Sequence, residues 1–359
     1  MNIISNLWIS FKYPVLILIA GITLVAYVGG MAQALVVAIL VILEISLSFD
    51  NAVINATLLK RMNAFWQKIF MTVGIVIAVV GMRLIFPVAI VAATAGLSFG
   101  VVIDLILHKP QLYAHELELA HPAIAAFGGF FLLMIFLDFV LDEAKRVHWV
   151  DVIEKPLAKG GRLKTLSTLI ALVVLLVVSA TWGREHAAKV MTSGALGLIA
   201  YLSVRGFSQL FEELGEVKTS ENSHGKSGQQ GVALAGKAAF FLFLYLEVLD
   251  ASFSFDGVVG AFAITSNVLT IAVGLGIGAI FVRELTVWLV RHDTLSEFVY
   301  LEHGAHYAVG ALAVLLFASM KYQIPEVVTG LVGVVFIAFS LGSSLKERKL
   351  NRHSAKSAY

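Results

Sequence analysis

The chain has no cysteine, and only 14% of its 359 residues are charged. The absence of cysteine excludes a disulfide framework and a thiolate metal site. The scarcity of charge, with 59% hydrophobic residues and a mean hydropathy of +0.89, excludes a soluble globular protein. A net charge of +2 is too small to indicate nucleic acid as a partner. The composition therefore predicts a protein whose partner is the lipid bilayer.

Long apolar runs dominate the rest of the sequence. A helix needs roughly 20 apolar residues to cross the hydrocarbon core, whereas the strands of a barrel are short and alternate in polarity. The runs predict an all-α, polytopic helical membrane protein whose transmembrane segments lie near residues 13–29, 32–58, 69–93, 122–141, 166–183, 190–211, 234–262, 267–290, 305–320 and 326–344. The run 69–107 contains Arg83 and Pro87, and it can form either one span with a half-helix or two spans.

The charge of the loops predicts the orientation. With these ten segments, the loops on one side carry 19 lysines and arginines and those on the other side carry 4. Because positive loops face the cytoplasm, we expect both termini there. Two full crossings within 69–107 would spoil this alternation, so one crossing with a partial one is favoured. The resulting parts are an N-terminal half (1–214), a flexible cytoplasmic linker (215–231), a C-terminal half (232–345) and a basic cytoplasmic tail (346–359).

Two acidic motifs lie inside these apolar runs. The segment from Glu44 to Val53 has a near copy from Asp250 to Val259, and one turn before the copy stands Glu247. In the predicted topology the first motif runs inward and the second runs outward, so the two halves are inverted repeats. Inverted repeats with polar sites and broken helices at the membrane midplane are typical of secondary transporters.

The carboxylates of these motifs need compensation. An acidic residue at the centre of a membrane helix costs roughly 2.5–3.5 kcal/mol. Pairing with Arg83 and Arg283 is one solution, and it makes these arginines candidates for counter-charge or gating roles. Two arginines cannot neutralise five carboxylates, however, so a bound divalent cation is expected. The five are Glu44, Asp50, Glu247, Asp250 and Asp256.

The other side chains of the motifs suit a hard cation. Asn51 offers an amide oxygen, and Ser46, Ser48 and Ser254 offer hydroxyls as accessory ligands. An all-oxygen set favours Mn²⁺, Ca²⁺ or Mg²⁺ over Cu⁺ and Zn²⁺. The extra carboxylates permit exchange with protons, because a carboxylate that loses its cation in apolar surroundings gains a proton more easily. Asp138 either lines the ion path or lies close to the cytoplasmic end of its span.

Helical spacing predicts a break in both motifs. Asp50 follows Glu44 by six residues, which places the two side chains about 120° apart on a regular helix. Asp256 stands in the same relation to Asp250. Both members of each pair can face one site only if the helix unwinds, and we expect this at Asn51 and at Gly257, residues that tolerate it.

The motifs also resemble those of a known family. Residues 44–52, E-x-S-L-S-F-D-N-A, are similar to the first signature of the TerC family of integral membrane proteins. Glu247-x-x-Asp250-x-x-Phe253-Ser254-x-Asp256, followed by residues 263–267, is similar to the second. The resemblance covers about a fifth of the chain closely. One departure is Gly257, where the family commonly has serine.

The resemblance implies a function. The TerC family is similar in architecture to LysE-type exporters, and it is associated with metal export, chiefly of Mn²⁺, and with tellurium resistance. It implies metal-site roles for Glu44, Asp50, Asn51, Glu247, Asp250 and Asp256. We therefore expect a transporter in the cytoplasmic membrane of a bacterium, with a metal ion and protons as its partners.

Several alternatives remain open at this stage. The protein could transport Ca²⁺, or it could be a membrane-assembly or metal- and tellurium-stress scaffold without transport. An intramembrane aspartyl protease is disfavoured, because neither Asp50 nor Asp256 lies in the Gly-x-Gly-Asp motif that such enzymes need. We expect no enzymatic activity. The cation, the direction and energy source of transport and the oligomeric state stay undetermined by the sequence.

Overall fold

A computed structural model describes residues 3–145, 147–160, 165–222, 234–265, 267–292 and 298–357. Some side chains within these ranges, including that of Asp256, lie outside the description. The described backbone is helical almost throughout, and it forms no strand. Six helical stretches of the described residues are long and apolar enough to cross a membrane, which confirms a polytopic helical membrane protein. They are 10–47, 64–93, 110–140, 184–207, 268–291 and 301–319.

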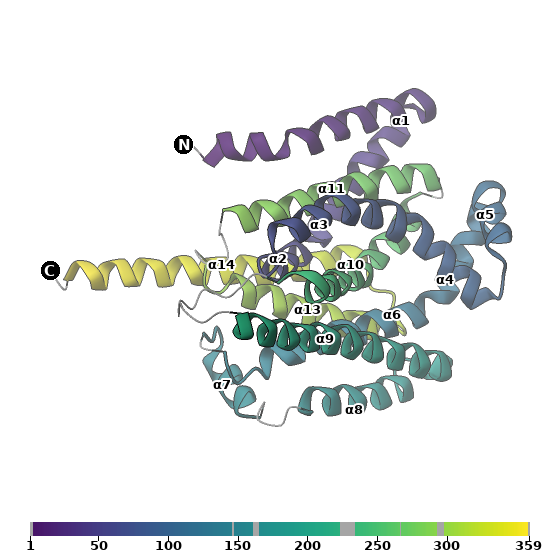
Figure 1. The fold of residues 1–359 in the computed structure, drawn as a ribbon. Helices are drawn as coiled ribbons and strands as arrows, with labels where there is room; N and C mark the ends of the chain where they lie inside the picture. Colours follow the sequence, from purple (N-terminus) through teal and green to yellow (C-terminus); the bar gives the residue numbers. More distant parts are fainter. Residues whose placement is uncertain are drawn as a thin grey trace.

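The helices form one elongated bundle (Figure 1). Each of the ten expected segments falls mainly on helical backbone, although several helices are much longer than the segments predicted for them. The helices are α1 (Ile3–Leu47), α2 (Phe49–Leu59), α3 (Ala64–Val76), η1 (Ile77–Ile85), α4 (Phe86–Ala95), α5 (Phe99–His108), α6 (Pro110–Val140), α7 (Asp151–Gly160), α8 (Leu166–Ala180), η2 (Arg184–His186), α9 (Ala187–Asn222), α10 (Gly236–Ile264), α11 (Val268–Arg291), α13 (Leu301–Ser319) and α14 (Glu326–Ser357).

Helix α1 contains the first expected segment and most of the second, and it changes direction between them at Gly30. Gly30 has φ 84° and ψ 171°, a conformation that only glycine adopts without strain. Residues of both arms of α1 pack around Ile277 of α11, with Val25 from the first arm and Val37 and Val41 from the second. The turn therefore lays both arms along the same neighbour, and the second arm carries Glu44 into the bundle.

The region 69–107 agrees with one crossing followed by a shorter piece. Helices α3, η1 and α4 follow one another without a gap from Ala64 to Ala95, and η1 has π-helical geometry. Gly96 then ends α4 in the left-handed conformation, with φ 66°. Helix α5 has 10 residues, about 15 Å of helix, which is half of what a membrane crossing needs.

Two expected loops are helical instead. Residues 215–222 of the predicted linker continue α9, and residues 346–357 of the predicted tail continue α14. The prediction of a flexible linker was therefore wrong for residues 215–222. The tail stretch is rich in lysine and arginine, and the linker stretch contains two glutamates and a lysine; these residues favour helix once a preceding helix supplies the nucleus. The rest of the linker, 223–231, lies outside the described residues.

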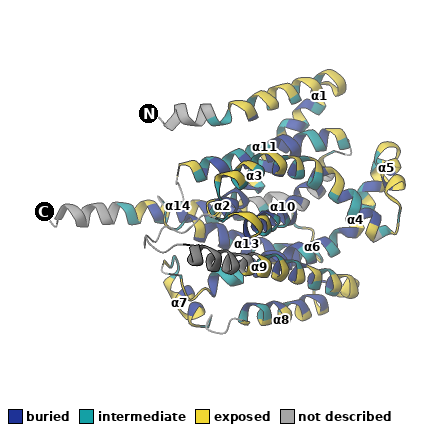
Figure 2. Cartoon of the chain, in the orientation of Figure 1, coloured by how far each residue is buried: buried dark blue, intermediate teal, exposed yellow. Residues whose placement is uncertain are grey.

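The core lies around the helices that carry the acidic motifs. Its largest cluster joins α2, α6, α9, α10 and α13, with Phe130, Phe131, Leu246 and Leu249 fully buried. Exposed residues are frequent on α1, α8 and α9, which lie at the periphery (Figure 2). Many of them are apolar, as expected of surfaces that face lipid. The acidic motifs are therefore enclosed by protein.

Candidate cation site

The two motif helices run in opposite directions and meet. Leu234, two residues before α10, exchanges backbone hydrogen bonds with Arg61 and Asn63, which follow α2. Farther along both helices, the Asn51 amide donates a hydrogen bond to Asp250 Oδ1 over 2.7 Å. Because the end of α2 lies beside the start of α10, the two helices are antiparallel. This is the arrangement expected of inverted repeats.

The first motif contains a break, but not at the expected residue. Helix α1 ends at Leu47 and α2 begins at Phe49, with Ser48 at φ −106° and ψ 14° between them. Asn51 lies inside α2, and α10 is helical through Gly257, so both predicted break points were wrong. The backbone hydrogen bonds Ser48 N to Glu44 O and Ala52 N to Ser48 O, both 3.0 Å, bridge the interruption. The break is therefore a local change of direction, and unwinding is not needed.

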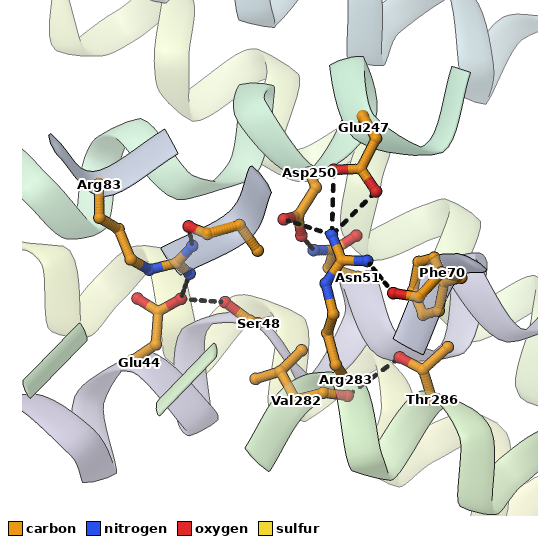
Figure 3. Close-up of polar contacts among 11 residues, drawn as sticks. Glu44, Ser48, Asn51, Phe70, Arg83, Glu247, Asp250, Val282, Arg283 and Thr286 are labelled. Carbon is orange, nitrogen blue, oxygen red and sulfur yellow. Dashed lines mark hydrogen bonds and ion pairs between the residues drawn. The ribbon is translucent and has the colours of Figure 1, made fainter. Parts of the chain in front are cut away.

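Glu44 is the acidic centre of the first half. Its side chain is buried and forms an ion pair with Arg83 of η1, and it accepts a hydrogen bond of 3.3 Å from Ser48 Oγ (Figure 3). Arg83 also donates to the carbonyl of Ala78 in its own π-helical segment. The wide π turn is a frequent feature of functional sites. Here it belongs to the segment that delivers a buried guanidinium to a buried carboxylate.

Arg283 is the centre of the second half. Its Nη2 lies 3.1 Å from both carboxylate oxygens of Glu247 and 3.5 Å from Asp250 Oδ2 (Figure 3). Its Nη1 donates to the carbonyl of Phe70 over 3.1 Å, and the guanidinium carbon lies 4.2 Å from the centre of the Phe70 ring. One cation on α11 thus holds two carboxylates of α10. Because Asp250 also accepts from Asn51, the second half is tied directly to the first.

A second approach between the halves involves Glu44. A methyl group at Gly257 of α10 would lie 3.0 Å from Glu44 Oε2, so this carboxylate rests against the α10 backbone where the second motif ends. The glycine that replaces the usual serine of the resembling family therefore makes room for an acidic side chain of the other half. The motifs converge at two points, through Asn51 and through Glu44.

Asp50 faces another direction. Its side chain is 4% exposed, and it accepts a hydrogen bond of 3.0 Å from the backbone N–H of Asn51. A methyl group at Gly333 of α14 would lie 3.2 Å from Asp50 Oδ2. Among the described residues, no basic side chain pairs with it. Asp50 and Glu44 therefore meet different neighbours, and in this arrangement they do not face one site.

The charges of the described site do not balance. Glu44, Glu247 and Asp250 are buried beside the guanidiniums of Arg83 and Arg283, whereas Asp50 is buried without a basic partner among the described residues. If all four acids are ionised, two negative charges remain without a cation. Buried charge of this kind is compensated by protons, by water or by a bound ion.

The remaining predicted residues lie in different surroundings. Ser254 is buried near this cluster, and its hydroxyl finds no hydrogen-bond partner in the described part of the chain. Ser46 is exposed and bonds to the carbonyl of Ile42 in its own helix, so it lies apart. Asp138 pairs with Arg205 and accepts a hydrogen bond of 2.5 Å from Tyr201, both on α9. The side chain of Asp256 lies outside the described residues.

Sequence reasoning missed Asn55. It is 2% exposed, it lies one turn after Asn51 on α2, and its Oδ1 has no hydrogen-bond partner among the described residues. The same holds for Oδ1 of Asn51. Two buried amide oxygens on one helical face thus have unused acceptor capacity, which a cation or water can satisfy. The signal was available, because Asn51 and Asn55 are four residues apart in an apolar run.

A second polar cluster, outside the apolar spans, also escaped prediction. Glu154 of α7 is fully buried, and its carboxylate lies 2.8 Å from Lys145 Nζ. It accepts hydrogen bonds of 3.2 Å from Tyr307 of α13 and from the backbone N–H groups of Trp149 and Val150. Burial acts to raise the pKa of Glu154, but the bonds from Lys145 and Val150 outweigh it, so the pKa lies below its usual value. This cluster fixes α7 to the bundle.

The guanidiniums occupy the positions next to the acidic side chains. In the described part of the chain, no three His, Cys, Asp or Glu side chains lie close enough together to hold a metal ion. An arginine that pairs with two carboxylates keeps their oxygens turned toward itself. The arrangement is therefore an arginine-paired state of the acidic cluster.

Comparison with known proteins gives one match. The profile of the family described as "Protein of unknown function (DUF475)" matches residues 49–351, which is most of the chain and includes Asp50, Asn51 and the whole second motif. Neither the curated proteins nor the solved structures contain a significant match. The comparisons therefore supply a family but no activity.

Proposed function

Because this chain belongs to the DUF475 family, whose function is unknown, we propose a function from the site itself: a secondary transporter that exports a divalent cation. The first candidate for the cation is Mn²⁺, and protons are the proposed counter-substrate. The proposed location is the cytoplasmic membrane of a bacterium, with both termini in the cytoplasm, as the loop charges predict. We propose no enzymatic role.

One observation carries this proposal. Four buried carboxylates, Glu44 on α1, Asp50 on α2 and two on α10, are accompanied by only two buried guanidiniums, so this region has spare negative charge in an apolar bundle. The unused oxygens of Asn51 and Asn55 add neutral ligands of the kind that hard cations accept. The resemblance of both motifs to TerC signatures supports Mn²⁺ in particular.

In the proposed cycle the arginines act as internal counter-cations. Arg283 stabilises Glu247 and Asp250 while no metal ion is bound, because a buried carboxylate without a partner is costly. An entering divalent cation takes over the carboxylates, and the guanidinium moves toward the Phe70 carbonyl and ring, which it already contacts. Protonation of the acids then favours release of the ion.

A scaffold without transport is the second candidate, and the same ion pairs favour it. In that case Arg83 and Arg283 simply neutralise buried acids and join the two halves, with no ion passing between them. A Ca²⁺ transporter is the third candidate, because an oxygen ligand set accepts Ca²⁺ as well.

Ion flux into liposomes that contain the purified protein distinguishes these candidates. We expect the wild type to carry Mn²⁺ and to carry protons in the opposite direction, whereas Asp50→Asn and Asp250→Asn should each abolish the flux. Asp104→Asn is the matched control, because Asp104 is exposed and pairs with His108 on α5. Flux of Ca²⁺ in place of Mn²⁺ would support the third candidate. No flux of either ion, with properly folded protein, would support the scaffold.

A further inference from the structure

Helix α7 lies outside the apolar spans but close to two of them. It begins eleven residues after α6 ends at Val140, and it ends six residues before α8 begins at Leu166. It lies at the end of the bundle where both ends of the chain lie (Figure 1). Both of its flanks are thus held by apolar helices, of which α6 is long enough to cross a membrane, and this position favours the membrane surface for α7.

The side chains of α7 divide into three faces. Glu154 and Ala158, four residues apart, are buried against the bundle. Val152, Ile153 and Leu157 are exposed by 86%, 49% and 40% and form a separate apolar face. Asp151, Lys155 and Lys159 form the third face, where Lys155 Nζ pairs with Asp151 Oδ2 over 2.7 Å. An amphipathic helix on the surface of a protein needs only one buried face, the face that packs on the protein. In α7 that face is formed by Glu154 and Ala158, so the exposed apolar face is an additional one.

The charge around α7 indicates what covers the apolar face. Residues 145–164 contain six lysines and arginines and two acidic residues. Of the two acids, Glu154 is buried and neutralised by Lys145, whereas Lys155 and Lys159 are exposed beside the apolar face. An apolar stripe flanked by lysines is complementary to anionic headgroups above acyl chains.

We propose that α7 is an interfacial helix that binds an anionic lipid surface. Val152, Ile153 and Leu157 enter the boundary between headgroups and acyl chains, and Lys155 and Lys159 contact the headgroup phosphates. Glu154 connects this helix to Lys145 and Tyr307, so the position of α7 on the lipid is transmitted to the end of α13. The proposal does not depend on the transported ion.

The absence of cysteine makes the proposal directly testable. Val152→Cys, Asp151→Cys and Ala158→Cys are made one at a time in the full chain, labelled with a nitroxide and reconstituted into vesicles of phosphatidylcholine and phosphatidylglycerol. Collision of the spin label with oxygen, which enters the bilayer, is compared with collision with a water-soluble nickel chelate. We expect oxygen to dominate at position 152, the chelate at 151, and neither at 158.

Two results at position 152 would overturn the proposal. Access of the chelate equal to that at 151 would show that the face is in water, and protection from both reagents would show that a protein or a second copy covers it.

The lysines have their own test, in which Lys155→Gln and Lys159→Gln are combined with Val152→Cys. Each lysine contributes roughly a fivefold factor to binding an anionic surface. The double variant should therefore lower the oxygen signal in anionic vesicles. An equal signal with and without the lysines would remove the role of the anionic headgroups.

Discussion

At the scale of single residues, Arg283 shows how two buried acids of the second half are neutralised. Its guanidinium is 3% exposed and lies within 3.5 Å of oxygens from Glu247 and Asp250. Removal of the positive charge leaves two acids buried and mutually repulsive. The loss of one partner from a buried ion pair typically costs about 3–5 kcal/mol. Any cation that can reach the two acids should then replace the arginine.

This reasoning gives a prediction for Arg283→Gln. The variant should unfold at a lower temperature than the wild type in detergent without divalent ions, because Glu247 and Asp250 lose their counter-charge. Addition of Mn²⁺ should raise its unfolding temperature more than that of the wild type, where the arginine competes. Thermal unfolding followed by tryptophan fluorescence, with and without Mn²⁺, measures both effects.

Lys145→Gln is the matched control for this experiment. It removes the charge of another buried ion pair, with Glu154, in a cluster that lies outside the spans. Its destabilisation should be independent of Mn²⁺. If Mn²⁺ restored both variants equally, or neither of them, the metal would not be replacing Arg283, and the exchange of cations at the acidic cluster would be wrong.

The sequence located the buried charges but not their pairing. Buried acids in apolar runs are conspicuous, and so are Arg83 and Arg283, because a charged side chain is costly in a membrane helix and therefore rare there. The pairing of Arg83 with Glu44, 39 residues earlier, depends on how η1 packs beside α1, and no local pattern contains that information. Asp50 is the clearest case. Its equivalence to Asp256 in the motif alignment did not reveal that it faces Gly333 of α14.

At the scale of helices, close packing of α1 on α11 places Glu44. Gly274 and Gly278 lie one turn apart on α11, and a methyl group at them would lie 2.7 Å from Leu40 Cβ and 2.5 Å from Glu44 Cβ, respectively. Small residues four apart allow membrane helices to approach closely. The two glycines thus form the surface on which the second arm of α1 rests.

Gly278→Ala tests this contact. The added methyl group has no space, so α1 must shift and move Glu44 relative to Arg83 and Gly257. Overpacking of this kind typically costs about 1–3 kcal/mol. We expect a lower unfolding temperature and a loss of the proposed ion flux in liposomes.

Gly206→Ala supplies the comparison. Gly206 lies in α9, where a methyl group would meet nothing within 4 Å, and an alanine there should stabilise the helix by about 0.5–1 kcal/mol. A Gly278→Ala protein as stable and as active as Gly206→Ala would show that the α1–α11 contact tolerates a methyl group and does not position Glu44.

The helices themselves were predictable to different degrees. Apolar runs locate the spans well, because burial in lipid and in the bundle needs the same residue types. The break at Ser48 was misplaced by three residues, since a serine breaks a helix only where tertiary contacts favour it. The sequence analysis did not predict α7, because the burial of Glu154 depends on Lys145 and Tyr307, which no local pattern places around it.

At the scale of the whole molecule, the bundle has two distinct ends. Both ends of the chain lie at one of them, together with α7, and α5 lies at the other (Figure 1). The turn at Gly96 and the hairpin between α10 and α11 belong to the end that carries α5, because each follows a helix that starts at the end with the chain termini. This arrangement matches the division of loops that the lysine and arginine bias predicts.

The two ends should therefore react on opposite sides of the membrane. In the cysteine-free chain, exposed Lys109, Glu185 and Lys321 are each replaced by cysteine for one end, and Asp142 and Lys159 for the other. Because the second group lies on loops of the positive side, it should be protected in intact cells from a thiol reagent that cannot cross membranes, whereas the first group should be labelled. Permeabilised cells supply the control for accessibility.

Labelling of either group alone fixes the orientation, but labelling of both groups in intact cells would break the predicted alternation. The two acidic motifs would then not be inverted copies across one membrane, and alternating access between antiparallel halves would lose its structural basis.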